Sequence, residues 1–225
     1  AGLVIGGLSM TGLGMKAANV IMTISGADPV ITLVIAALVT IILGLGMPTP
    51  SAYILAAVLV GPALSKLGYP LLQSHMFLLY YAILSALTPP IAVAALAAAA
   101  IAEEDPFKIA FDAVKLAAVG FLLPFVFIWN PAIIGEGSGL QVALALMGGV
   151  VAAISLAVAI EGYLNGKQNR IARCMFVGIA VACVAPFIYI AIPGIFFGCV
   201  LLVRNYNTSS NTSDKVTESQ NIPGA

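Results

Sequence analysis

The chain has 225 residues, of which 61% are hydrophobic and only 8% are charged, and its mean hydropathy is +1.11. A soluble domain of this length needs far more charge on its surface, so the composition excludes an ordinary soluble protein. The formal net charge is zero, which leaves no basic patch and predicts that nucleic acid is not a partner. We expect an all-α polytopic membrane protein surrounded by membrane lipid.

The first 24 residues are apolar and rich in glycine, which permits close packing between membrane helices. Lys16 is the only charge in this stretch, and we interpret it as a side chain that reaches water by snorkelling rather than as a functional charge. The sequence begins at Ala1 without Met or a basic signal segment. We therefore expect the chain to be the C-terminal part of a longer protein.

Residues 30–65 form the first of two interrupted apolar stretches. Asp28 and Pro29 precede it as a helix-start signature. The interruption at residues 44–51 reads Gly-Leu-Gly-Met-Pro-Thr-Pro-Ser, in which the glycines allow a turn and the prolines remove amide donors. Each flanking run has roughly 15 apolar residues, fewer than the ~20 that a full crossing needs. The sequence therefore predicts a re-entrant helical hairpin over residues 30–65.

Residues 73–102 form the second interrupted stretch. Residues 73–87 and 91–102 are together long enough to cross a membrane, and Thr88, Pro89 and Pro90 break the helix between them. We predict a discontinuous transmembrane helix here. A hairpin tip next to a broken helix is how secondary transporters build ion and substrate sites, so we expect residues 1–102 to form one half of a transport domain.

Both breaks carry groups that suit an ion site. Hydroxyls come from Thr49, Ser51, Ser85 and Thr88, whereas carboxylates are absent. Unwound carbonyls and helix C-termini favour a cation, and helix N-termini favour an anionic group. The lack of carboxylates suits a monovalent ion better than Ca²⁺. The alternative interpretation is that both breaks are ordinary kinks in packed membrane helices.

Residues 103–115 are predicted to form a short amphipathic helix along the membrane interface. Asp105 caps its start, and Phe107 begins an apolar face opposite Lys108 and Lys115. The acidic side chains at 103–105 could also bind a metal, but a solvated helix cap is the interpretation that we favour.

Additional transmembrane helices are expected over residues 116–203, with a kink at Pro124. Residues 174–203 are either one kinked crossing or two short helices, and the sequence leaves both open. The polar tail at 204–225 is predicted to be disordered.

The positive charges predict the topology. The loop after residues 140–160 carries Lys167, Arg170 and Arg173, and the positive-inside rule places it in the cytoplasm. The hairpin then opens from the outer side, with Lys66 outside.

Two segments resemble the large membrane subunit of TRAP (tripartite ATP-independent periplasmic) transporters, specifically the fused permeases associated with TAXI-type binding proteins. They are Gly-Leu-Gly-Met-Pro-Thr at 44–49 with Tyr53, and Ala-Ile-Leu-Ser-Ala-Leu-Thr-Pro-Pro at 82–90. The Ala-rich stretch into Asp105 and the segment from Phe125 to Ala132 are also similar. The resemblance covers residues 1–135.

The resemblance implies one half of an elevator-type, sodium-coupled importer in a bacterial or archaeal inner membrane. It would receive a small organic acid from a periplasmic substrate-binding protein. Its partners would be the missing N-terminal half and a small membrane subunit or its fused equivalent. It implies no cofactor beyond sodium.

The implied site residues divide between the two breaks. By position, Ser85 and Thr88 belong to the sodium site of the broken helix, next to Pro89 and Pro90. The hairpin tip contributes the residues Gly44, Gly46, Thr49 and Ser51. Many family members have Gly at Ser85, and the TAXI-like group commonly has Thr-Thr-Ala at 49–51, so the ligands at the tip depart from the family pattern.

Two other classes of function are weighed against transport. In a non-transporting assembly subunit, the broken helices would serve packing only. An intramembrane enzyme would need a nucleophile, an acid pair or a metal cluster, and no Asp or Glu falls within a predicted span except Glu161 at a helix end. We therefore expect the chain not to be an enzyme.

Overall fold

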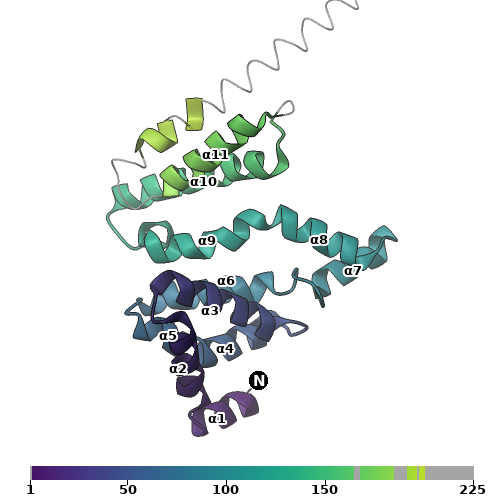
Figure 1. The fold of residues 1–225 in the computed structure, drawn as a ribbon, viewed down its shortest axis with the longest axis vertical. Helices are drawn as coiled ribbons and strands as arrows, with labels where there is room; N and C mark the ends of the chain where they lie inside the picture. Colours follow the sequence, from purple (N-terminus) through teal and green to yellow (C-terminus); the bar gives the residue numbers. More distant parts are fainter. Residues whose placement is uncertain (1, 165–167, 185–191, 197, 201–225) are drawn as a thin grey trace, which may run out of the picture. The chain divides into compact units, whose positions relative to one another are not determined.

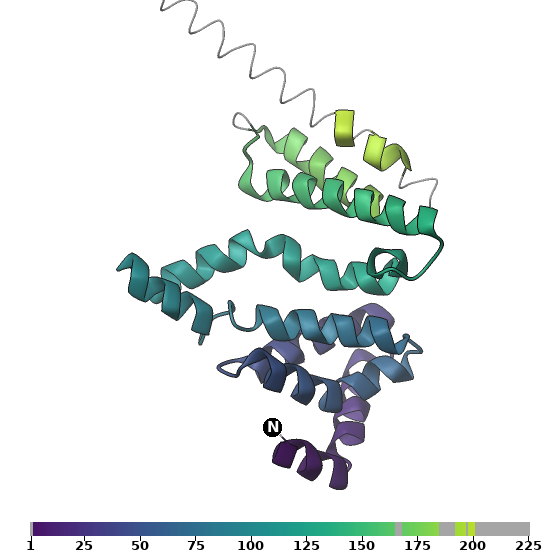
Figure 2. The ribbon, with the colours of Figure 1, turned by 180° about the vertical axis from the view of Figure 1, so that it is seen from behind.

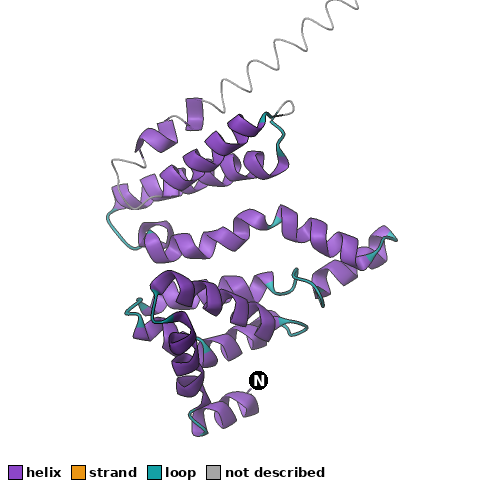
Figure 3. Cartoon of the chain, in the orientation of Figure 1, coloured by secondary structure: helices purple, strands orange, loops and turns teal. Residues whose placement is uncertain are grey.

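The computed structural model describes residues 2–164, 168–184, 192–196 and 198–200. These residues form helices joined by short loops, with no strand among them, as Figure 3 shows. The prediction of an all-α membrane protein is confirmed. The chain divides into two compact units, residues 1–134 and 135–225.

The first unit begins with two helices, α1 (Gly2–Met10) and α2 (Leu13–Ser25). Gly12 joins them with a left-handed backbone (φ 62°), a conformation that glycine adopts without steric cost. α2 then packs closely on a later helix, because a Cβ built on Gly14 would lie 2.4 Å from the Val58 carbonyl oxygen. Only glycine permits that approach.

The predicted hairpin is formed by α3 (Pro29–Gly44), α4 (Thr49–Leu59) and α5 (Gly61–Lys66). The Asp28 carboxylate caps α3 by accepting a hydrogen bond from the Ile31 amide (2.8 Å). α3 and α4 pack against each other on either side of the turn at residues 45–48. The returning limb was expected to be continuous, but it breaks at Val60, because Pro62 lacks the amide that would continue the helix.

The predicted broken helix is formed by α6 (Leu71–Leu84) and α7 (Val93–Ala102), which Figure 1 shows separated by a loop. Residues 85–92 are the elbow, which is longer than the predicted break at residues 88–90. Pro89 and Pro90 have no amide to donate to the carbonyls of Ser85 and Ala86, so the helix cannot continue through the elbow, and α6 ends three residues earlier than expected. The Ala94 amide instead donates to the Ala86 carbonyl (3.1 Å) and closes the elbow.

An aromatic cluster holds α6 in the core of the first unit. Phe77 and Tyr81 are buried, and both make edge-to-face contacts with Phe125 of α9 (Ala118–Trp129). The Tyr81 hydroxyl donates a hydrogen bond to the Phe121 carbonyl (2.6 Å). α6 therefore has one fixed position against α9, and its C-terminal end presents the elbow.

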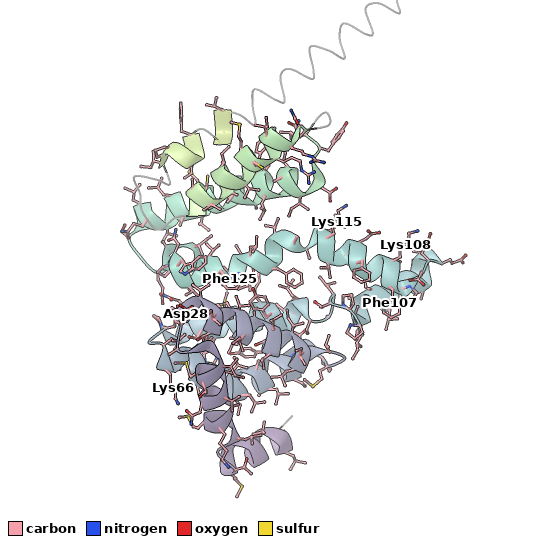
Figure 4. The ribbon with its side chains drawn as sticks, in the orientation of Figure 1. Asp28, Lys66, Phe107, Lys108, Lys115 and Phe125 are labelled. Atoms are coloured by element: carbon pink, nitrogen blue, oxygen red, sulfur yellow. The ribbon has the colours of Figure 1, made fainter. Side chains whose placement is uncertain are left out.

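The predicted amphipathic helix is α8 (Pro106–Leu116). Asp105 caps it by accepting hydrogen bonds from the amides of Phe107 and Lys108. In Figure 4 the lysines of α8 project from one side and Phe107 from another. α9 continues through Pro124, where a kink was predicted, and the 42° bend lies at the junction of α8 and α9. A 3₁₀ turn (Pro131–Ile134) ends the unit.

The second unit contains α10 (Gly139–Glu161), packed against α11 (Arg170–Val184). Arg170 and Arg173 were expected in a loop but lie in the first turn of α11. The Arg173 guanidinium donates to the carbonyls of Ala159 and Ile160 at the end of α10. Some predictions concern residues that lie outside the described part of the chain. These are the position of Lys167, the tail at 204–225 and part of residues 174–203, for which one span or two were left open.

Only one described helix, α10, is long and apolar enough to cross a membrane alone. α8 and α9 make a second candidate if the bent pair counts as one span. α3, α4, α6 and α7 are apolar but shorter, which is the pattern expected of hairpins and broken helices. The number of crossings and the re-entrant character of the hairpin stay predictions.

Replacing Tyr81 by Phe is expected to lower the free energy of unfolding by about 1 kcal/mol, because the Phe121 carbonyl loses its hydroxyl donor. Thermal unfolding of the purified full-length protein measures this loss. Tyr80→Phe is the matched control, since Tyr80 contacts Phe127 edge-to-face in the same helix pair and its hydroxyl has no hydrogen bond among the described residues. Equal effects of the two substitutions would contradict the role assigned to Tyr81.

Candidate cation site at the hairpin tip

The hairpin tip touches the elbow at Gly44 and Ser85. A Cβ built on Gly44 would lie 2.3 Å from the Ser85 Oγ and 2.7 Å from its Cβ, so no larger residue fits without a shift. Ser85 is 1% exposed. In both Figure 1 and Figure 2 the loop after α3 and the break after α6 lie on the same side of the bundle. The structure therefore brings the two predicted breaks together.

A second contact joins Gly46 to the far end of the elbow. Gly46 has a left-handed backbone (φ 75°), and its missing Cβ would lie 3.4 Å from two methyl carbons of Ile91. The side chain of Ile91 therefore covers the turn of the hairpin. This contact closes the apolar side of the site.

The two elbow hydroxyls keep their lone pairs available. The Ser85 Oγ donates to the Ala82 carbonyl (2.7 Å), and the Thr88 Oγ1 donates to the Leu84 carbonyl (2.9 Å). Each hydroxyl hydrogen is used by the preceding helical turn, so only oxygen lone pairs remain to face another group. Such oxygens are suited to a cation.

Backbone carbonyls add further oxygens. At the tip, no backbone amide of a described residue donates to the carbonyls of Leu45 and Gly46. At the elbow, the same is true of the carbonyls of Leu87 and Pro89. Carbonyls without donors are costly inside a membrane unless a cation or water satisfies them.

The helix ends give the site its electrostatic character. α3 ends at the tip and α6 ends at the elbow, so two C-termini with partial negative charge meet there. α4 and α7 begin at the same two segments, and no side chain caps either start. The arrangement can thus hold a cation by the C-termini and an anionic group by the N-termini.

The tip and elbow carry no acidic side chain. Nor do the described residues contain a group of three or more His, Cys, Asp or Glu side chains that could hold a metal ion. Ca²⁺ sites draw on several carboxylates, so this oxygen set is better matched to a monovalent cation.

Thr49 and Ser51 lie in the first turn of α4 and are half-buried. Their hydroxyls make no hydrogen bond among the described residues, and no contact with the elbow is assigned to them. Pro89 and Pro90 lie in the elbow and are joined by a cis peptide bond. Their contribution as ligands stays a prediction.

Sequence reasoning missed two residues of the site. Ile91 was expected inside the second half-helix, yet it lies in the elbow and covers Gly46. Ala92 has a left-handed backbone (φ 38°) that is rare for a residue with a side chain. No local signal marks Ala92, whereas the paired prolines could have suggested a longer break.

Gly44→Ala is expected to destabilise the protein by about 1–3 kcal/mol, because the new methyl group overlaps Ser85. Thermal unfolding measures the effect. In a Ser85→Gly background, which removes the two closest atoms and leaves only the Ala52 Cβ at 3.3 Å, most of the cost of Gly44→Ala should disappear.

Gly61→Ala serves as the control for Gly44→Ala, since its added Cβ would meet only Leu78 Cδ1 at an ordinary 3.8 Å. Equal losses at the two glycines, or no rescue by Ser85→Gly, would contradict the contact between tip and elbow.

Comparison with protein-family models matches residues 1–141 to the family described as "Tripartite ATP-independent periplasmic transporter, DctM component". Comparisons with curated proteins and with solved structures give no match. The matched segment spans more than half of the 225 residues and contains the hairpin and the elbow. The chain therefore belongs to the DctM family, the large permease component of tripartite ATP-independent periplasmic (TRAP) transporters.

Proposed function

We propose that this permease chain is part of a sodium-coupled transporter that imports a small organic acid. The observation that carries the proposal is the contact between Gly44 and Ser85, which joins two non-helical segments lined with unpaired carbonyls. Sodium prefers oxygen ligands, and the hydroxyls of Ser85 and Thr88 supply two more. The candidate ligand set is thus mainly backbone.

Sodium bound between tip and elbow would couple the ion to the substrate. A cation that touches both segments favours the state in which they are in contact, and it disfavours any state in which they separate. If the substrate needs the uncapped starts of α4 and α7 in that same state, each ligand raises the affinity for the other. This mutual increase in affinity would couple the import of the substrate to the binding of sodium.

The substrate class is inferred from the helix N-termini. The amides of Thr49 in α4 and of Val93 and Ala95 in α7 have no backbone acceptor among the described residues, and such amides suit a carboxylate, which fits a small organic acid. Neither the tip nor the elbow has an arginine or lysine. Any charged clamp on the carboxylate would therefore come from the N-terminal half that we expect to precede this chain.

The proposed partners and location follow the family. The transporter would work with a TAXI-type periplasmic binding protein and a small membrane subunit, or its fused equivalent, in a bacterial or archaeal inner membrane. The chain would cross the membrane several times. The site supports neither of the two alternative functions. A non-transporting assembly subunit would have no use for the carbonyls that lack donors, and an enzyme would need reactive groups that the tip and the elbow lack.

Thr88→Val in the full-length protein is expected to reduce sodium-dependent uptake at least about ten-fold, because a methyl group replaces a ligand oxygen. Uptake into vesicles with and without sodium measures the effect. Thr23→Val is the matched control, since the Thr23 Oγ1 makes the same bond to the fourth preceding carbonyl (2.9 Å) in α2. Unchanged uptake in the Thr88 variant would overturn the proposed sodium site.

The topology has its own test, made in a background from which the native cysteines have been removed. The Lys66→Cys variant should react with a membrane-impermeant thiol reagent added from the periplasmic side, because the proposed hairpin opens outward. The Lys108→Cys variant, altered in the interfacial helix, should react from the cytoplasmic side only. Labelling at position 66 from the cytoplasm alone would reverse the topology.

A further inference from the structure

A cavity of about 420 Å³ lies at the end of the hairpin opposite its tip. Its walls come from α2, α4, α5 and the first turn of α6. Figure 4 labels Lys66, one of its lining residues, on the side of the bundle away from the tip. The cavity is therefore separate from the candidate cation site.

One wall of the cavity contains a buried hydroxyl without a partner. Ser74 lines the cavity and is 2% exposed, and its Oγ has no hydrogen bond among the described residues. A buried hydroxyl left unpaired costs about 1–3 kcal/mol. A ligand atom that accepts or donates a hydrogen bond would relieve this cost if the ligand entered the cavity.

The surroundings of Ser74 favour an anionic ligand. Lys66 lines the cavity, and its ammonium also donates to the Asn19 side chain. α6 begins at Leu71 with no side-chain cap, so the positive end of a 14-residue helix adjoins the cavity. No acidic residue is among the lining residues. Cationic and amide donors here are thus not neutralised by a carboxylate.

His75 adds a polar group with one nitrogen already used. Its Nδ1 is hydrogen-bonded to the Tyr53 hydroxyl (2.7 Å), which fixes the ring against α4. The ring lines the cavity, and its Nε2 remains for a further hydrogen bond. Together with Ser65 and Ser74, it gives the polar wall the donors that a phosphate needs.

Apolar side chains also line the cavity and continue onto the surface. Leu71 is 70% exposed and Met15 is 53% exposed, and both line the cavity. The volume is of the size of a small-molecule site and accommodates a lipid head group, but not its acyl chains. The chains would lie along the exposed side chains of Leu71 and Met15.

We propose that this cavity binds the phosphate head group of an anionic phospholipid, held by Lys66, Ser74 and the start of α6. A membrane protein meets such lipids at high concentration, and an amphiphile matches a lining that combines polar groups with exposed apolar side chains. Free phosphate shares the head-group chemistry but makes no use of the apolar side chains.

The test is lipid titration of the full-length protein, purified in a neutral detergent and followed by native mass spectrometry. The added probes are phosphatidylglycerol, phosphatidylcholine and inorganic phosphate. We expect phosphatidylglycerol to bind more tightly than the other two. Ser74→Ala should weaken its binding roughly ten-fold and Lys66→Gln roughly five-fold, whereas Lys66→Arg should retain it.

Two matched variants separate binding from stability. Ser155→Ala removes the other buried hydroxyl that has no partner among the described residues, and Ser155 belongs to α10 and is not among the residues that line the cavity. Lys108→Gln removes an exposed lysine of α8 that does not line the cavity either. Both should keep the affinity for phosphatidylglycerol. Ser74→Ala should leave thermal stability without lipid equal or higher, because it deletes an unsatisfied group.

Several results would overturn the proposal. Equal binding of phosphatidylcholine would assign the cavity to neutral lipid, and tight binding of inorganic phosphate alone would make it a soluble anion site. Retained affinity in both the Ser74 and Lys66 variants would place the lipid elsewhere, and a loss in the Ser155 control would indicate a general effect on folding. Sodium-dependent uptake is measured separately from lipid binding, so failure of the lipid proposal would not contradict the proposed transport function.

Discussion

Unpaired backbone carbonyls inside an apolar environment are the constraint on which the arrangement of residues 29–102 depends. Lipid offers no hydrogen-bond donor, so a turn or an unwound segment must be enclosed by protein or by a bound ion. The fold meets this constraint by placing the turn after α3 against the break after α6. That approach is possible because Gly44 has no side chain where Ser85 lies.

The rest of the first unit holds these two segments in contact. The close packing of α2 on α4 at Gly14 fixes the returning limb of the hairpin. The hydrogen bond from Tyr81 to Phe121, and the aromatic contacts around Phe125, fix α6. The tip and the elbow therefore adjoin helices whose positions are fixed by contacts some distance away. The contacts that fix α6 are made by side chains, whereas the proposed site consists mainly of backbone groups.

Local signals in the sequence were sufficient to predict most elements of this unit. Asp28 and Asp105 cap helices as expected, because a capping residue followed by proline acts within one helical turn. The break at Val60 could have been found from Gly61 and Pro62, which are breakers of the same kind. α9 continues through Pro124, and the 42° bend between α8 and α9 at Ala117 is a further feature that no local signal indicated.

Contacts between distant segments could not be predicted in the same way. Nothing near Gly44 in the sequence indicates that Ser85 lies against it, because that contact depends on how α3 and α6 pack. The left-handed backbone of Ala92 likewise arises from closing the elbow through the Ala94 amide, and alanine gives no sign of it. The resemblance to a family supplied the pairing of the two breaks, which the residues alone only suggested.

α7 and α8 fold back on each other, which links the elbow to the interfacial helix. α7 has 10 residues, so it measures about 15 Å from end to end. Its far end runs through residues 103–105 into α8, the helix proposed for the membrane surface. Because the buried Ala92 and Ala95 at the start of α7 cluster with Ala110 of α8, the elbow is tied to α8 at both ends of this short helix, and a displacement of α8 would carry the elbow with it.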